Sequence, residues 1–370
     1  MPSPPRSLRP RHGQDARLGA RGRVGEKAAF LNVLDRATGY LLGVIILGSV
    51  VLVVVPVSVA GEEGWSAIAE QKVLYTNNAF QLSSARRLSL AEDPSQPTNV
   101  QVDKPSDVVW EPSVDLRRTS SNRLGNLEIS TKAHGFIFTD HSALNHGNYR
   151  IQVRQALSPE TSVLFRYRYV PNLFLGPNFE RRSGTRSVQD ERVTSHIWRA
   201  QVERALSDVV STTMTARFGL RLYNDVFAER DTFFYTLGPQ MDYAVRPNLT
   251  LSLGYLYERG LADGRGDTRF NDDISYRQHF VSSGGEFRLA PKLSLNLQYA
   301  FRRKNFTSDL AGDTHLGRRD TTHQGTAELR YAFSDSTGIT LGFQHAQRTS
   351  NVATKDFNDT NTSLGIQHRF

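Results

Sequence analysis

The feature that most constrains the fold of this chain is an alternation of apolar and polar side chains with a period of two residues. It is clearest at the carboxyl end, where one face of the segment 362–370 carries Leu364, Ile366, His368 and Phe370. A period of two predicts a β-strand, because successive side chains along a strand point to opposite faces. The apolar face of this strand includes the last residue of the chain, which is aromatic.

The same pattern recurs from residue 72 onward in runs of roughly ten residues separated by turn residues. In the run 293–301 the odd-numbered residues are Leu, Leu, Leu, Tyr and Phe, and the residues between them are polar or Ala. The pattern predicts 14 strands, at 73–78, 107–118, 125–139, 147–156, 161–170, 191–206, 211–223, 231–245, 249–259, 275–289, 293–305, 322–334, 337–348 and 361–370.

The connections between these strands alternate in length. Short turns are expected at 158–160, 207–208, 246–248, 290–292 and 335–337, and long polar loops at 171–190, 224–230, 260–274, 306–321 and 349–360. Outer-membrane barrels have short periplasmic turns and longer external loops. An even strand number would place both ends of the barrel in the periplasm, and the segment 81–106 would be the first external loop.

The terminal strand resembles that of bacterial outer-membrane β-barrel proteins, which end in Phe after alternating apolar residues. The segment 105–112, Pro-Ser-Asp-Val-Val-Trp-Glu-Pro, resembles the start of β-barrel porins of uncharacterised function. The resemblance covers residues 72–370. It implies an all-β fold, a transmembrane antiparallel up-and-down β-barrel of about 14 strands in the bacterial outer membrane, with Phe370 as the membrane-assembly signal. It implies no substrate and transfers no functional residues.

Composition agrees with a barrel that is apolar outside and wet inside. Apolar residues make up only 38% of the chain, yet aromatic residues make up 10%. A soluble sandwich or jelly roll would alternate in the same way, but aromatic residues at strand ends, the terminal Phe and the leader favour a membrane barrel. The chain has no cysteine, which excludes a lipoprotein anchor, disulfides and thiolate metal sites.

The first 60 residues are expected to be a secretory signal sequence with an extended basic n-region. Residues 1–39 contain eight basic and three acidic residues, and Tyr40–Ala60 is uncharged and strongly apolar. Small residues at Ser58 and Ala60 suit a signal peptidase, although an uncleaved membrane helix has a similar length. Residues 61–71 are then expected to form a periplasmic N-terminal segment or a plug, and residues 72–370 the barrel.

The polar faces of the strands carry both signs of charge. The expected basic ladder in the lumen comprises Arg150, Arg154, Arg166, Arg168, Arg199, Arg217 and Arg221. Its expected acidic partners are Asp115, Glu128, Glu203, Asp242 and Glu258. Charges inside a barrel need water or each other. The interior is therefore either a water-filled pore that favours anions or a network of ion pairs.

These faces predict a porin-like channel for small hydrophilic solutes, anions among them. Two alternatives stay open: a barrel that exports a polysaccharide, and a structural or adhesive barrel with a closed lumen. The expected partners are outer-membrane lipid and lipopolysaccharide, the barrel-assembly machinery at the terminal strand, and the small solute or polymer. Nucleic acid is not expected, because the sequence has no basic stripe with interleaved aromatic residues.

No enzymatic activity, cofactor or metal is expected. His141-Ser142, Asn271-Asp272-Asp273 and Asp313-x-His315 lie in predicted loops, and nothing in their spacing places a nucleophile beside a base. Such polar loops are usually solvated. The sequence has no His-Glu-x-x-His motif and no phosphate-binding loop. His279, His345 and His368 are interpreted as interfacial residues on the apolar faces.

Overall fold

The computed structural model describes residues 64–79, 106–185, 187–352 and 355–370. The expected signal sequence, residues 1–60, and most of the expected first loop, 81–106, lie outside these residues. In the described part of the chain, no helix combines the length and the apolar character required to cross a membrane.

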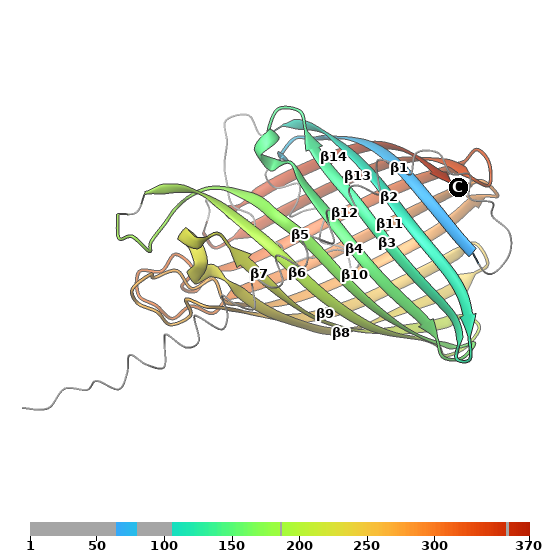
Figure 1. Cartoon of the computed structure of the whole chain (residues 1–370), viewed down its shortest axis with the longest axis horizontal. Coiled ribbons are helices and arrows are strands. Elements are labelled where there is room, and N and C mark those ends of the chain that lie inside the picture. The colour runs from blue at the N-terminus through green and yellow to red at the C-terminus, as the bar shows by residue number, and fades with distance from the viewer. Residues whose placement is uncertain (1–63, 80–105, 186, 353–354) are drawn as a thin grey trace, which may run out of the picture. The chain divides into compact units, whose positions relative to one another are not determined.

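The described residues form fourteen β-strands, each paired antiparallel with the next in the chain (Figure 1). The strands are β1 Gly64–Thr76, β2 Asp107–Asn122, β3 Gly125–Phe138, β4 His146–Ala156, β5 Thr161–Phe179, β6 Val188–Ala205, β7 Val210–Tyr223, β8 Thr232–Arg246, β9 Leu249–Ala262, β10 Tyr276–Ala290, β11 Leu293–Phe306, β12 Arg319–Ala332, β13 Thr337–Ser350 and β14 Phe357–Arg369. The predicted strand number and order are confirmed.

The sheet closes on itself because β1 also pairs with β14. The register runs from Ile68 opposite Arg369 to Thr76 opposite Asn361, and the backbone N–H of Phe370 donates to the carbonyl of Ala67 at 2.9 Å. Closure satisfies the backbone groups that an open sheet edge would expose, which a membrane environment requires. The role of Phe370 as an assembly signal stays a prediction.

The first strand begins earlier than predicted. Residues 64–71 were expected to lie in a periplasmic segment or plug, but they belong to β1; all of them pair with β2, and 68–71 also pair with β14. The sequence signal is weak here because Ala67, Ala69 and Gln71 occupy the face shared with Trp65. Small and polar residues at these positions obscure the alternation, and only pairing with two neighbours places this segment in the wall.

The connections at the two ends of the barrel differ in length, as predicted. One end has turns of two to four residues, at 123–124, 157–160, 206–209, 247–248, 291–292 and 333–336. The other end has the longer loops, which contain the short 3-10 helices η2 (Ser142–Leu144) and η3 (Asp225–Arg230). The carboxyl terminus lies at the short-turn end (Figure 1).

The outward face of the barrel is an apolar band. Its exposed residues include Leu237, Leu253, Leu297, Leu341 and Phe343. Three outward histidines toward the long-loop end are each hydrogen-bonded to a tyrosine on the neighbouring strand: His196 to Tyr167 at 2.7 Å, His279 to Tyr255 at 2.8 Å, and His323 to Tyr299 at 2.7 Å. Amphipathic aromatic residues of this kind mark the membrane interface of barrels.

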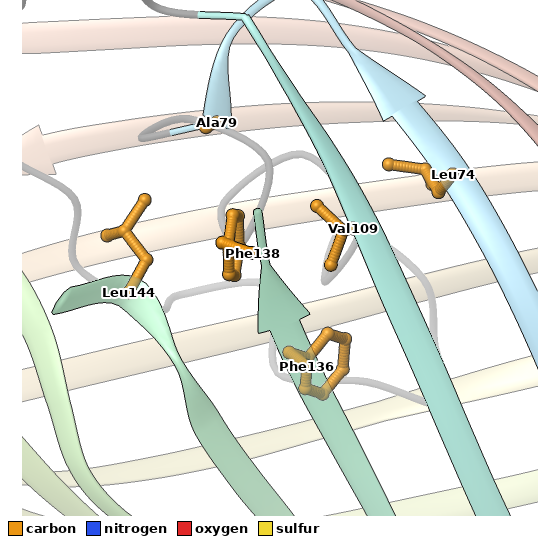
Figure 2. Packing of buried hydrophobic residues seen from close by; sticks show 6 residues of the cluster. All are labelled: Leu74, Ala79, Val109, Phe136, Phe138 and Leu144. Atoms are coloured by element: carbon orange, nitrogen blue, oxygen red, sulfur yellow. The ribbon is translucent and has the colours of Figure 1, made fainter. Parts of the chain in front are cut away.

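The inward face is mainly polar but carries several apolar clusters, one of them near the long-loop end of β1–β3. Leu74, Val109, Phe136 and Phe138 come from these strands and pack with Ala79 and with Leu144 of η2 (Figure 2). Alternation places them on the inner face, because their neighbours Val73 and Val108 are exposed outside. This part of the interior is therefore filled with apolar side chains.

Candidate functional site

The candidate site is the lumen, and one continuous row of directly opposed residues crosses most of its wall. Each residue in the row faces the next across a strand pair: Gln152, Arg166, Arg199, Arg217, Thr236, Glu258, Gln278, Lys304, Asp320 and Ser350. The row runs from β4 to β13, so residues almost 200 positions apart in sequence contribute to a single line.

The predicted basic ladder lies largely along this wall. Arg150 faces Arg168 across β4 and β5, and Arg199 faces both Arg166 and Arg217. Arg154 faces Leu164 instead. Arg168, Arg199, Arg217 and Arg221 are buried from solvent by at least nine-tenths of their surface.

Three of the predicted acidic partners form ion pairs with the ladder. Asp115 pairs with Arg150 at 2.6 Å, Glu203 pairs with Arg154, and Glu258 pairs with Arg217 at 3.5 Å. The other two have different partners: Glu128 pairs with Arg117 at 3.2 Å, and Asp242 accepts from the side-chain amide of Gln240 at 3.0 Å. Both interpretations of the interior therefore describe part of the ladder.

The buried carboxylate of Glu258 is the centre of a hydrogen-bonded network across β7–β10. It accepts from the hydroxyl of Thr236 at 2.6 Å and from that of Tyr276 at 2.7 Å. The Tyr276 oxygen accepts from Arg221 at 3.0 Å, and the Arg221 guanidinium lies 4.0 Å from the centre of the Phe234 ring. This network, called the Glu258 network below, fixes the two arginines of β7 against the wall.

The last part of the chain matches a known family model. Residues 265–370, which contain β10–β14, match the family model described as "Putative beta-barrel porin 2". The matched segment ends with β14, which pairs with β1 and closes the wall. The chain is a bacterial outer-membrane β-barrel. The family description names a porin rather than an enzyme.

Solved structures similar to this barrel include an outer-membrane channel, a porin and another outer-membrane protein. They include the outer-membrane channel DcaP of Acinetobacter baumannii (11% identity, 83% of this chain and 97% of that one, TM-score 0.48). An anion-selective porin from Comamonas acidovorans has 11% identity over 83% and 99% of the two chains, with a TM-score of 0.44. OmpT of Vibrio cholerae has 7% identity over 85% and 100%, with a TM-score of 0.46. These values are too low to transfer a solute. No curated protein matches the chain in sequence.

The lumen of the outer-membrane barrel contains two adjoining cavities toward its periplasmic, short-turn end. One has a volume of about 470 Å³, the other about 410 Å³, and Gln201, Glu203 and Gln240 line both. The second also reaches Arg154, Arg166 and Arg199 of the ladder. Polar lining of this kind accommodates water and small hydrophilic solutes.

A third cavity, of about 350 Å³, lies toward the external end and is strongly basic. Its charged lining comprises Arg181, Arg230, Arg302, Lys304, Arg318, Arg348 and Lys355 against Glu191 and Asp320. Asp320 is bound by Arg318 at 2.9 and 2.6 Å. In the described chain, neither Lys304 nor Arg348 forms an ion pair; the Lys304 ammonium lies 3.8 Å from the centre of the Tyr276 ring, and Arg348 donates to the carbonyl of Lys355 at 2.7 Å.

Most of this basic cavity was not predicted from the sequence. Four of its residues come from four different segments, and none was assigned to the ladder: Lys304 of β11, Arg318 of the β11–β12 loop, Arg348 of β13 and Lys355 of the β13–β14 loop. Alternation could have placed Lys304 and Arg348 on the inner face, but their convergence depends on register. Burial, together with the positive charge of Arg318 and Arg348, lowers the pKa of Lys355 in the β13–β14 loop.

Two loop motifs that were expected to be solvated are buried together. Asp272, from the β9–β10 loop, and Asp313 and His315, from the β11–β12 loop, place one ligand atom each within 4.8 Å of the others. Arg230 of η3 binds both oxygens of Asp272, at 2.6 and 3.0 Å, and Glu191 at 2.7 Å. The guanidinium of Arg230 already binds Asp272, so the cluster needs no metal to hold its three external segments together. We call this cluster the loop lock.

The loop lock is expected to weaken in acid. Burial by itself would raise the pKa of Asp313, but hydrogen bonds from His315 and Ser308 lower it to about 2, from 3.8. A carboxyl with a lowered pKa contributes stability that is fully present above about 3.8 and is lost as the pH falls toward 2. Hydrogen exchange of residues 308–318, corrected for its intrinsic pH dependence, should therefore accelerate over this interval. Asp313→Asn should remove the acceleration, and an unchanged profile in that variant would contradict the assignment.

Proposed function

We propose that the barrel is a porin-like channel for small hydrophilic solutes with a preference for anions. The observation that carries the proposal is the direct opposition of Arg166 and Arg199 on adjacent strands of the lumen wall, where both line the cavity of about 410 Å³. Like charges directly opposite one another across a sheet are destabilising. Such an arrangement is tolerated where water and mobile anions reach it, and charged rings of this kind set pore selectivity.

The distribution of charge along the lumen supports the same preference. At the ladder, Arg166 is held by the side-chain oxygen of Gln152, at 2.8 and 2.6 Å, and this neutral partner leaves its charge in place. Toward the external end, seven basic residues face two acidic ones in the cavity that contains Lys304 and Arg348. An anion entering from outside would meet positive potential first at this cavity and then at the ladder.

Conductance of the purified barrel in planar bilayers tests the proposal. Under a salt gradient, the reversal potential should show that chloride passes more readily than potassium. The double variant Arg166→Gln/Arg199→Gln should lower the anion-to-cation permeability ratio by about twofold or more, because two cationic groups leave the lumen wall. Arg118→Gln is the control, since Arg118 is an exposed residue at the short-turn end that lines none of these cavities. A cation-selective wild-type channel would contradict the anion preference.

A structural barrel with a closed lumen is the second candidate, and the Glu258 network favours it. Arg217, Arg221 and Tyr276 are held by buried contacts on the inner face, where an open pore would leave them hydrated. Complete absence of conductance in the wild-type protein would support this candidate over the channel. Polysaccharide export, the remaining alternative, stays a prediction from the sequence.

A further inference from the structure

Four arginines form a cluster on the outer surface of β9–β12, near the external end. Arg259 faces Arg277 directly across β9 and β10, Arg303 faces His279, and Arg319 faces Asn305. Their sequence neighbours Glu258, Gln278, Arg302 and Asp320 are buried in the lumen, so alternation directs all four guanidinium groups outward. We call these residues the outer arginine cluster.

The outer arginine cluster has no protein counter-charge. Within the described ranges, none of the four guanidinium groups forms an ion pair or a side-chain hydrogen bond. The outward residues beside them are Tyr257, Leu261, His279, Asn305 and Thr321, which carry no carboxylate. Like charges directly opposite, as at Arg259 and Arg277, cost stability unless an external anion neutralises them.

The cluster lies just above the level at which the outer surface becomes apolar. On the side toward the periplasm, the next outward positions include the hydrogen-bonded pairs Tyr255–His279 and Tyr299–His323. Tyr299 is four residues along β11 from Arg303, roughly 13 Å at the rise of a strand. An anion held by the cluster would therefore sit at the membrane interface, at headgroup depth.

An apolar groove continues from that level on the same strands. It has a volume of about 860 Å³ and is lined by residues including Leu251, Leu253, Leu297, Tyr299 and Phe343. Gly285 and Gly325 contribute no side chain on its floor, and a Cβ built at Gly325 would have no heavy atom within 4 Å. Its largely apolar lining suits a hydrocarbon chain.

We propose that the outer face of β9–β12 binds lipopolysaccharide, with the lipid A phosphates on the outer arginine cluster and an acyl chain in the groove. Guanidinium groups suit phosphate because they donate paired hydrogen bonds in a planar fork. Four strands span roughly 14 Å, an extent that suits a disaccharide carrying two phosphates better than a single phosphate. The long-loop end faces outward from the cell, where lipopolysaccharide is the phosphorylated lipid of the leaflet.

Native mass spectrometry of the full barrel in a neutral detergent tests the proposal, with diphosphorylated lipid A as the probe. Arg277→Gln/Arg303→Gln should weaken lipid A binding by about tenfold or more, since two charge-assisted contacts are lost. Arg118→Gln/Arg204→Gln is the matched control, because both arginines are exposed and lie at the short-turn end. The charge-conserving variant Arg277→Lys/Arg303→Lys should retain most of the affinity.

Three further probes identify the ligand. Monophosphorylated lipid A should bind more weakly than the diphosphorylated form, and phosphatidylglycerol more weakly still. Inorganic phosphate should not compete at concentrations that saturate the lipid. Equal binding of phosphatidylglycerol and diphosphorylated lipid A, or displacement by inorganic phosphate alone, would overturn the proposal.

The groove is tested separately with Gly325→Leu. The open space at Gly325 allows the larger side chain without strain, and the leucine would occupy the acyl-chain position. Lipid A binding should fall several-fold while heat-modifiable gel mobility remains that of the folded barrel. Unchanged lipid A affinity in both the arginine and the glycine variants would overturn the proposal. Because these residues lie outside the lumen, the result is independent of the conductance measurement.

Discussion

Glu258→Gln is expected to destabilise the folded barrel by about 3–5 kcal/mol, the usual cost of removing one member of a buried ion pair. The carboxylate of Glu258 and the guanidinium of Arg217 are each only 1% exposed, so no solvent replaces the lost charge. Arg221, held through Tyr276, also loses its link to a negative group. Urea unfolding of the barrel in lipid bilayers measures the change.

Glu328→Gln is the matched control for this prediction. Glu328 also faces the lumen and pairs with an arginine, Arg330, but the Arg330 side chain is 63% exposed at the short-turn end. Solvent-exposed pairs contribute about 0–1 kcal/mol, so this variant should unfold almost like the wild type. The double variant Arg217→Gln/Glu258→Gln should recover part of the loss, because it leaves no unpaired buried charge. Similar effects of the two single variants would disprove a special role for the Glu258 network.

Leu253→Arg is expected to destabilise the barrel by about 2–4 kcal/mol or to prevent its assembly, because the residue faces lipid within the apolar band. Leu253 is 54% exposed on the outer surface. It lies on β9 between Leu251 and the interfacial Tyr255, within the apolar band. The folded fraction can be followed by heat-modifiable gel mobility and the stability by urea unfolding in bilayers.

The neighbouring substitution Ser252→Arg provides the comparison. Ser252 lines the lumen cavity of about 410 Å³, where an added guanidinium can remain hydrated. The same residue type one position away should therefore cost much less than on the outer face, and should act mainly on selectivity. If Ser252→Arg were the more damaging of the two, the inside and outside of this wall would be reversed.

Much of the fold could be predicted from local pattern. The run 293–301 and the terminal strand alternate so regularly that only strands with one apolar face satisfy them. The alternation of short turns with long loops predicted which end of the barrel faces the periplasm. The prediction was wrong at 64–71, where Ala67, Ala69 and Gln71 hide the period. It also ended β5 at residue 170, whereas the strand continues through Leu173 to Phe179 past two irregularities in register.

Less of the candidate site than of the fold could be predicted from the sequence. Alternation was enough to place Arg199 and Glu258 on the inner face, because facing depends only on residue parity within a strand. It could not show that Arg154 pairs with Glu203 across β5, or that Asp272 and Asp313 are buried around Arg230. These contacts depend on loop conformation and on how far each strand is shifted against its neighbour.

The sequence by itself determined that the chain forms strands with an apolar and a charged face, because alternation with a period of two depends only on the order of neighbouring residues. It also determined that these strands number fourteen, and it named the arginines that point inward. Only the tertiary structure decided which charges meet. The shift in register that accumulates around a closed barrel carries one row from Gln152 on β4 to Ser350 on β13. The pairing of Arg217 with Glu258, and the grouping of four arginines on the outer face of β9–β12, follow from that shift.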